Sequence, residues 1–305
     1  MVQSIILTGP TAVGKSSLAI EIAEMLGLEI INADSVCFYR HFNIGSAKPT
    51  PEELTRVKHH LIDVADPNET YHAGQFFRDC MAALEGIHSR GKRALIVGGS
   101  GFYLKALRYG LWEAPPTSIE FRNTLQDRSN PELHEKLSAL DAEHAKKISV
   151  SDRYRLIRAL EIIEISGKKP SELEASMDKV PNPAFSLWVV DREKTELQER
   201  MKARIEVMME SGLIEETEQL NQQFPESKVL SSVGYAQVMN YLNGVLPPGR
   251  KLRPGLAGLQ DEIELAHRQL AKQQRTWFKN LKPEQEFILD LEKNALKEKL
   301  ILLYQ

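Results

Sequence analysis

Short apolar runs alternate with segments of helical periodicity along the first third of the chain. Three runs, at 4–8, 29–33 and 94–97, have the length of buried strands, and each ends in polar or glycine residues. Between them, segments 16–26 and 73–90 repeat apolar residues at helical spacing. This alternation predicts an α/β fold in which helices flank a parallel sheet on both faces. Ligands of such folds bind at the carboxyl ends of the strands.

The pattern changes in the second third of the chain. A Pro-rich loop at 114–117 is followed by helical, charge-rich sequence, and the apolar run 185–190 then has the length of another buried strand. We therefore predict two domains. An α/β core with C-terminal helices is formed by 1–111 and 185–305, and 112–184 is a helical insertion. The alternative is a continuous chain of helices packed on one core.

The segment Gly-Pro-Thr-Ala-Val-Gly-Lys-Ser fits the pattern G-x-x-x-x-G-K-[ST] and lies between a predicted strand and a predicted helix. Glycines allow successive amide N–H groups to point at one anion, and the helix N-terminus adds partial positive charge. Lys15 supplies an ammonium group for outer phosphate oxygens, and the Ser16 hydroxyl suits a bound Mg²⁺. The sequence thus predicts a P-loop NTPase-like sheet with a phosphate site made by Gly9, Pro10, Thr11, Ala12, Val13, Gly14, Lys15 and Ser16.

A carboxylate near this loop is the first candidate for proton transfer. Nucleotide hydrolases and kinases usually place an Asp for Mg²⁺ at the end of a later strand, but the run 94–97 continues into Gly98-Gly99-Ser100-Gly101 without an acid. Asp63 is a weak substitute. Asp34 follows the second predicted strand, from which it would face the phosphate loop and could accept a proton from a nucleophile. The alternative for Asp34 is a turn or helix-capping residue.

Composition narrows the class of protein. The 305 residues are 42% hydrophobic and 27% charged, which excludes a disordered chain and allows one large domain or two compact ones. No apolar run approaches the roughly 20 residues that span a bilayer, and the N-terminus lacks the pattern of a secretory signal. Two cysteines, Cys37 and Cys80, are too few for a disulfide framework or a cysteine-based zinc site. We therefore expect a cytoplasmic protein.

A nucleic-acid site would need local clusters of positive charge, because the net charge is −3. Segment 146–169 has seven Lys and Arg against three acids, and 267–282 has five against none. In the second segment Arg268, Lys272, Arg275 and Lys279 fall on one helix face, with Trp277 and Phe278 interleaved. The alternative is an ordinary solvated amphipathic face with core aromatics.

An ordered series of motifs runs along almost the whole chain, at 9–16, 34–40, 44–49, 59–63, 98–103, 155–161, 233–235 and 268–272. In this series the sequence closely resembles the tRNA dimethylallyltransferases, also called tRNA isopentenyltransferases. A P-loop is shared by many families, but the ordered series is specific. Departures from the family pattern are Cys37 where Gln is common, Asn43 where Asp is common, and Ser100 where Thr is usual.

The resemblance implies a defined reaction. The exocyclic amine of an adenine next to the anticodon of tRNA attacks C1 of dimethylallyl diphosphate, and pyrophosphate leaves with the help of Mg²⁺. By the match Asp34 is the base, Ser100 hydrogen-bonds near the reacting end or the diphosphate, and Arg122 contacts the substrates. Arg204 matches the diphosphate-binding arginine better than Arg200 does. These assignments make Asp34, Ser100 and Arg122 the expected catalytic residues.

The resemblance also implies where tRNA binds. The flipped adenine and the anticodon stem-loop would lie in a channel between core and insertion, with the diphosphate entering from the other side. We expect a monomer without membrane contact. The implied tRNA-binding residues are Asp34, Ser35, Val36, Cys37, Ser100, Arg122, Tyr154, Arg155, Leu156, Ile157, Arg158, Ser232, Val233, Gly234, Tyr235, Lys272, Arg275 and Lys279.

Three other functions are compatible with parts of the pattern. A small-molecule kinase shares the loop, the Mg²⁺ site and an Asp base, but it does not need the basic helices. An adenylate isopentenyltransferase, which acts on free nucleotides, resembles the first half only. An RNA-binding module with a relic loop would not need both Lys15 and Asp34.

Overall fold

The computed structural model describes residues 3–112, 114–177, 180–245, 253 and 255–304, and the chain divides into two compact units. Unit 1 consists of Met1–Arg108 and Asn182–Gln305, and unit 2 is Tyr109–Pro181. The sequence analysis predicted a helical insertion over 112–184, the part of the chain that corresponds to unit 2.

Unit 1 is built on a six-stranded sheet in which every pairing is parallel, with the order β3-β2-β4-β1-β5-β6. The prediction of an α/β fold with a parallel sheet is confirmed. The predicted strands are β1, β2, β4 and β5. The prediction of C-terminal helices missed β6, and β3 was also missed, because both are short edge strands without an apolar run. The strands are β1 (Ser4–Thr8), β2 (Glu29–Asn32), β3 (His59–His60), β4 (Ala94–Val97), β5 (Phe185–Asp191) and β6 (Gln285–Ile288).

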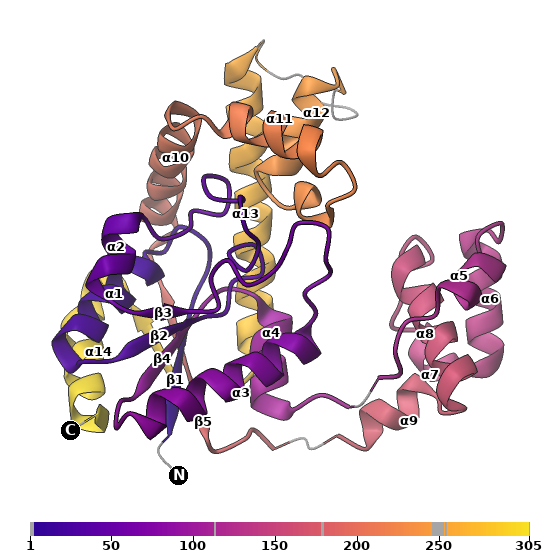
Figure 1. The fold of residues 1–305 in the computed structure, drawn as a ribbon, viewed down its shortest axis with the longest axis horizontal. Helices are drawn as coiled ribbons and strands as arrows, with labels where there is room; N and C mark the ends of the chain where they lie inside the picture. Colours follow the sequence, from indigo (N-terminus) through magenta and orange to yellow (C-terminus); the bar gives the residue numbers. More distant parts are fainter. Residues whose placement is uncertain (1–2, 113, 178–179, 246–252, 254, 305) are drawn as a thin grey trace. The chain divides into compact units, whose positions relative to one another are not determined.

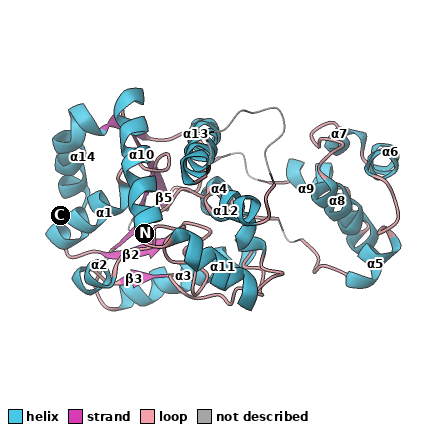
Figure 2. Cartoon of the chain, turned by 90° about the horizontal axis from the view of Figure 1, so that it is seen from above, coloured by secondary structure: helices cyan, strands magenta, loops and turns pink. Residues whose placement is uncertain are grey.

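Helices α1 and α14 cover one face of this sheet, and α3 and α4 cover the other (Figures 1 and 2). Alternate strand residues such as Ile5 and Leu7 join the core beneath α1 and α14, because successive side chains of a strand point to opposite faces. The helices of unit 1 are α1 (Lys15–Leu26), α2 (Pro51–Arg56), α3 (Ala73–Ser89), α4 (Gly101–Tyr109), α10 (Lys194–Glu210), α11 (Leu213–Gln223), α12 (Tyr235–Leu242), α13 (Leu256–Asn280) and α14 (Leu289–Tyr304), with the 3₁₀ helix η1 (Lys228–Ser231).

Unit 2 is helical and has a small apolar core of its own. Side chains such as Leu133, Leu137 and Leu156 form this core. Its helices begin at polar caps, for example Ser129, which forms a capping box with Glu132 at the start of α6. The helices are α5 (Ile119–Thr124), α6 (Asn130–Leu140), α7 (Ala142–Ala145), α8 (Arg153–Ser166) and α9 (Pro170–Ala175).

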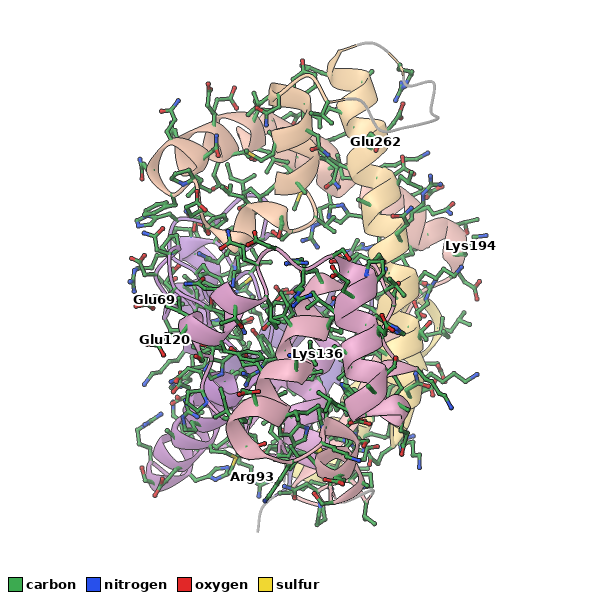
Figure 3. All side chains as sticks on the ribbon, turned by 90° about the vertical axis from the view of Figure 1, so that its right-hand side faces the viewer. Glu69, Arg93, Glu120, Lys136, Lys194 and Glu262 are labelled. Carbon is green, nitrogen blue, oxygen red and sulfur yellow. The ribbon has the colours of Figure 1, made fainter. Side chains whose placement is uncertain are left out.

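Charged side chains are distributed over the surface of the molecule. Glu69, Lys136 and Lys194 are among those that are exposed (Figure 3). Within the part of the chain that the structure describes, every helix is too short or too polar to span a bilayer.

Candidate active site

The carboxyl ends of the parallel strands meet at one edge of the sheet, and a pocket lies there. It has a volume of about 110 Å³. The P-loop follows β1, Asp34 follows β2 and the glycine-rich loop follows β4, so the parallel topology brings these three segments together. Residues that line the pocket include Thr11, Lys15, Ser16, Asp34, Cys37, Ser46, Ala47, Gly98, Arg204 and Gln274.

The P-loop holds its lysine in a poorly hydrated position. Lys15 Nζ donates to the carbonyl oxygens of Gly9 at 2.8 Å and Pro10 at 2.9 Å. Burial lowers the pKa of Lys15 to about 8, and the nearby Asp34 carboxylate partly opposes this shift. Gly9 must be glycine, because a Cβ would lie 2.1 Å from the carbonyl oxygen of Val190. The ammonium group is therefore placed where an arriving phosphate would compensate for its lost hydration.

Two arginines hold the loop backbone from outside this pocket. Arg200 Nε donates to the Ala12 carbonyl at 3.1 Å, and Arg192 Nε donates to the Val13 carbonyl at 2.8 Å. Both arginines line a second, separate cavity beside Gly14, of about 210 Å³. Since Arg200 bonds the loop while Arg204 lines the pocket with Lys15, the geometry favours Arg204 as the diphosphate ligand.

Arg204 has a hydrogen-bond donor without a partner. Its Nε is buried and has no acceptor among the described residues. Burial lowers the pKa of Arg204, and Asp34 opposes this shift. A buried, unpaired guanidinium N–H is rare in folded proteins unless a ligand satisfies it. The donor therefore suits the anionic oxygens of a diphosphate.

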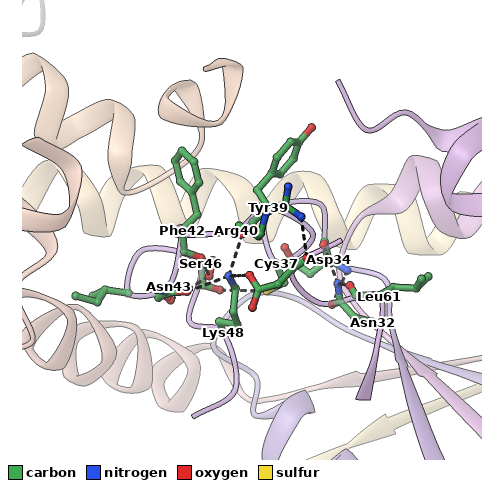
Figure 4. A network of polar contacts seen from close by, with 12 residues as sticks. Asn32, Asp34, Cys37, Tyr39, Arg40, Phe42, Asn43, Ser46, Lys48 and Leu61 are labelled. Carbon is green, nitrogen blue, oxygen red and sulfur yellow. Dashed lines mark hydrogen bonds and ion pairs between the residues drawn. The ribbon is translucent and has the colours of Figure 1, made fainter. Parts of the chain in front are cut away.

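Asp34 is fixed by the side chain of Asn32 at the end of β2 (Figure 4). Asn32 Oδ1 accepts from the backbone N–H of Asp34 at 3.0 Å, and its Nδ2 donates to the carbonyl oxygens of Asp34 at 3.2 Å and Leu61 at 2.9 Å. Asp34 Oδ1 accepts from the backbone N–H of Val36 at 3.1 Å. The carboxylate is thus oriented by its own turn, as the alternative interpretation expected, while it also lines the pocket.

Ser100 joins the loops that follow β2 and β4. Its Oγ accepts from the backbone N–H of Ser35 at 2.8 Å. This bond uses a lone pair of the oxygen, so the hydroxyl proton remains available to donate. Ser100 is therefore bound to the residue that follows Asp34, but it is not among the residues that line the pocket.

Asp63 contacts a buried lysine of the neighbouring loop. Its Oδ1 accepts from Lys48 Nζ at 2.6 Å, and the same ammonium donates to Tyr39 O at 2.9 Å and Asn43 Oδ1 at 3.0 Å (Figure 4). The Lys48 side chain is only 6% exposed. Three acceptors therefore satisfy one buried cation, and they fix the segment between Tyr39 and Lys48.

Gln274 is a site residue that the sequence prediction missed. Its Oε1 accepts from Thr11 N at 2.8 Å, and its Nε2 donates to Gly99 O at 3.0 Å. The side chain thus ties the P-loop to the loop after β4 from α13. A Cβ on Gly99 would lie 2.5 Å from this Nε2, so a side chain there would displace the Gln274 amide. The only sequence signal was a polar residue at a position where the helix pattern is buried.

The basic residues of α13 differ in whether an acidic side chain lies next to them. Arg275 makes a bidentate ion pair with Asp191 at the end of β5, with both N–O distances 2.7 Å. Arg268 lies 3.8 Å from Glu264. Lys272 and Lys279 are exposed. The prediction grouped all four as one cationic face, but Arg275 has an acid partner from a distant strand.

The predicted tRNA-binding segment 232–235 contains one residue with a buried side chain, Tyr235. The Tyr235 ring is fully buried, and its hydroxyl donates to Glu216 at 2.6 Å. Burial raises the pKa of Tyr235, and Glu216 adds to this shift. Ser232 and Val233 are partly exposed, and Gly234 is buried.

In unit 2, the predicted arginines share one carboxylate. Glu161 is 0% exposed and accepts from Arg122 at 2.9 Å and from Ser118 N at 2.7 Å, and Arg158 forms a further ion pair with it. The Arg122 guanidinium lies over the Tyr154 ring, 5.8 Å from its centroid. Burial would raise the pKa of Glu161, but hydrogen bonds from Arg122 and Arg158 outweigh it and lower the pKa to about 2.

Other predicted residues of this unit lie on the same helix, α8. Tyr154 is 61% exposed and Arg155 pairs with Asp152 at 3.0 Å, whereas Leu156 belongs to the apolar core. Ile157 packs against that core and is partly buried. Glu161 thus organises Arg122 and Arg158 beside an exposed aromatic ring, a role that its helical position in the sequence did not reveal.

Glu161→Gln is expected to destabilise unit 2 by about 3 kcal/mol, because two guanidinium groups lose their buried counter-charge. The folded pKa lies below the ordinary value of 4.5. The carboxylate therefore contributes its full stability above pH 4.5, and this contribution disappears as the pH falls towards 2. Thermal unfolding of both proteins at pH 7 and pH 3 measures the effect, and the difference between them should shrink at pH 3.

The matched control is Glu164→Gln, an exposed position on the same helix, which should unfold like the unsubstituted protein. An equal loss in both variants would mean that the buried carboxylate has no special role.

Comparison with known proteins is consistent with this geometry. The IPP transferase family model matches residues 37–281. The chain is 40% identical to "tRNA dimethylallyltransferase 1" of Citrifermentans bemidjiense, over 91% of this chain and 89% of the relative. It is 37% identical to "tRNA dimethylallyltransferase" of Nitrosomonas europaea, over 99% and 95%.

Solved structures show the same fold. The full-length tRNA isopentenylpyrophosphate transferase of Bacillus halodurans superposes with a TM-score of 0.70 at 28% identity, covering 100% of this chain and 97% of that one. A eukaryotic dimethylallyltransferase acting on tRNA gives a TM-score of 0.81 at 24% identity, covering 98% and 78%, a likeness of fold.

Proposed function

This chain belongs to the IPP transferase family and has tRNA dimethylallyltransferase activity, and from this premise we propose how its residues carry out the reaction. The donor is dimethylallyl diphosphate, and the acceptor is the N6 amine of an adenine next to the anticodon. One observation supports this assignment most: a single pocket is lined by Lys15 and Arg204, two cations suited to a diphosphate, and by the Asp34 carboxylate.

The transfer exchanges one bond for another. The N6 lone pair forms a bond to C1 of the donor, the C1–O bond breaks, and its electron pair leaves with pyrophosphate. The N6 proton passes to Asp34. An adenine amine is a weak nucleophile because its lone pair is delocalised into the ring, so orientation and a base for the proton are the main aids.

Developing charge on pyrophosphate would be met by cations held in place before the reaction begins. Lys15 and Arg204 are both poorly hydrated, so their attraction for an anion is stronger than in water. The Ser100 hydroxyl would donate to the donor or the adenine. Arg122, beside Tyr154 in unit 2, would contact the RNA substrate.

Mg²⁺ is proposed as the cofactor, held by Ser16 and by phosphate oxygens of the donor. Ser16 lines the pocket and is exposed. A single hydroxyl fits Mg²⁺, which usually keeps several waters and binds through substrate phosphates. When bound, the ion would neutralise charge on the leaving pyrophosphate.

Transfer of radioactivity from labelled dimethylallyl diphosphate to unmodified tRNA tests this function. Parallel reactions offer AMP and ATP. Label on tRNA alone is the expected result. Label on AMP would indicate an adenylate isopentenyltransferase, transfer of the ATP γ-phosphate would indicate a kinase, and tRNA binding without chemistry would indicate an RNA-binding module.

We propose that Lys272 and Lys279, exposed on α13, bind tRNA phosphates. Changing both to alanine should weaken tRNA binding and reduce the slope of log Kd against log salt by about 1.5 to 2, because two phosphate contacts disappear. Filter binding across a salt series gives this slope.

The control replaces Lys194 and Lys202, which are exposed on α10. Binding that responds equally to both pairs, or to neither, would assign Lys272 and Lys279 to the solvated face.

We further propose that the protein works as a monomer in the cytoplasm, where its tRNA substrates are found.

A further inference from the structure

The backbone segment 43–45 points three consecutive N–H groups at the carboxylate of Glu216, a residue of α11. Its oxygens accept from Asn43 N at 3.1 Å, from Ile44 N at 3.0 Å and from Gly45 N at 3.2 Å. Converging amides of this kind bind an anion, and hydrogen bonds to an ionised acceptor are stronger than those to a neutral one. One carboxylate of α11 therefore holds the whole turn.

Tyr235 of α12 contacts the same carboxylate and the same turn. Its hydroxyl donates to Glu216 Oε1 at 2.6 Å, and its ring packs edge-on against Phe42 with centroids 5.1 Å apart. A Cβ on Gly45 would lie 2.5 Å from the Tyr235 ring carbon Cζ. No side chain therefore fits at position 45 without displacing the ring. We call Glu216, Tyr235 and residues 43–45 the α11–α12 joint.

The next residues after the joint form a wall of the candidate active site. Ser46 and Ala47 line the pocket together with Asp34 and Lys15. The Cys37 thiol donates to the Ser46 carbonyl at 3.8 Å, which ties the wall to the segment after Asp34. Ala47 has φ 47°, a left-handed conformation that is uncommon for a residue with a Cβ. Such a conformation persists only where surrounding contacts hold it.

We infer that Glu216 is a positioning residue for the transfer reaction, which acts through the backbone of 43–45 on the pocket wall at 46–47. This inference rests on the proposed function. Glu216 is not among the residues that line the pocket, so it acts on the substrate through the loop. The diphosphate ligands Lys15 and Arg204 belong to other elements, so their affinity for pyrophosphate should not depend on Glu216.

Glu216→Gln tests the inference, because glutamine keeps the size of the side chain but loses its charge and one acceptor. The turnover number with tRNA is expected to fall about 10- to 100-fold, since hydrogen bonds to a charged acceptor are lost and a donor faces the amides. The dissociation constant for inorganic pyrophosphate with Mg²⁺, measured by calorimetry, should change less than about twofold.

Two further variants accompany it. Tyr235→Phe keeps the buried ring and removes one hydrogen bond, so the loss should be smaller, about 3- to 10-fold. The double variant should lose less than the product of the two single effects, because both residues act through one contact. Glu218→Gln, exposed on the same helix, is the matched control and should behave like the unsubstituted protein.

Labelling of Cys37 reports on the wall without any activity measurement. Both cysteines are buried, and peptide mass spectrometry follows each with a thiol reagent. In Glu216→Gln the labelling rate of Cys37 should rise about tenfold because the wall opens locally, while that of Cys80, in α3, stays unchanged.

The outcomes separate the possibilities. Unchanged turnover with unchanged Cys37 labelling overturns the inference. Faster labelling of both cysteines, or a parallel loss of pyrophosphate affinity, would make Glu216 a general structural residue and would also overturn it. If the unsubstituted protein does not label tRNA, the proposed function fails, while Cys37 labelling still shows whether Glu216 holds the wall.

Discussion

Asp34→Asn should slow the transfer step by about 10²- to 10⁴-fold, the usual contribution of a general base. Asparagine keeps an oxygen that can accept from the backbone N–H of Val36, as Asp34 Oδ1 does at 3.1 Å. The turn should therefore survive. The amide cannot take a proton from the adenine amine at neutral pH. Single-turnover transfer with saturating tRNA and donor measures the chemical step directly.

The affinity for tRNA serves as the control for this variant and should remain within about twofold. Equal losses of affinity and of rate would instead make Asp34 a binding or turn residue. Asn32→Ala provides a matched comparison, because it removes the side chain that fixes Asp34 but leaves the base in place. It should therefore cost less in rate than Asp34→Asn.

Lys15→Met should reduce kcat/KM for dimethylallyl diphosphate by about 10²- to 10³-fold, the usual loss when a preorganised charge-stabilising donor is removed. The pKa of Lys15 is lowered by burial to about 8. Affinity of the unsubstituted free protein for the donor should therefore fall as the pH rises through 8, because the neutral amine no longer offers a charge. The variant should lack this dependence.

The same substitution has an expected effect on stability. Between pH 8 and the ordinary value of 10.5, the unfolded chain binds more protons at this lysine than the folded protein does. Stability attributable to Lys15 therefore rises with pH across that window. Thermal unfolding of both ligand-free proteins at pH 7 and pH 10 isolates this contribution, because other groups cancel in the comparison.

Arg192→Met is the matched control, since Arg192 donates to the loop carbonyl of Val13 and does not line the pocket with Lys15. A control variant as defective as Lys15→Met, with the same loss of pH dependence, would contradict the assigned role of the lysine. A melting difference between Lys15→Met and the unsubstituted protein that is the same at pH 7 and pH 10 would contradict the lowered pKa.

The local sequence was sufficient for the central part of the fold. The apolar runs that became β1, β2, β4 and β5 and the periodic segments that became α1 and α3 were visible because both patterns depend on neighbouring residues. The P-loop was equally visible, since its glycines, Lys15 and Ser16 act within one turn of backbone. The edge strands β3 and β6 were missed because their pairing depends on a neighbouring strand rather than on an apolar run of their own.

The partners of the charged and polar side chains were decided only by the tertiary structure. Arg275 pairs with Asp191, Gln274 joins Thr11 to Gly99, and Glu216 holds the turn at 43–45. Each contact crosses more than 80 residues of chain, so no local spacing encodes it.

The chain by itself therefore determined which chemical groups are present and the elements that carry them. The folded structure determined which groups share a pocket, because hydrogen bonds and ion pairs form between atoms a few ångströms apart in space, wherever they stand in the sequence.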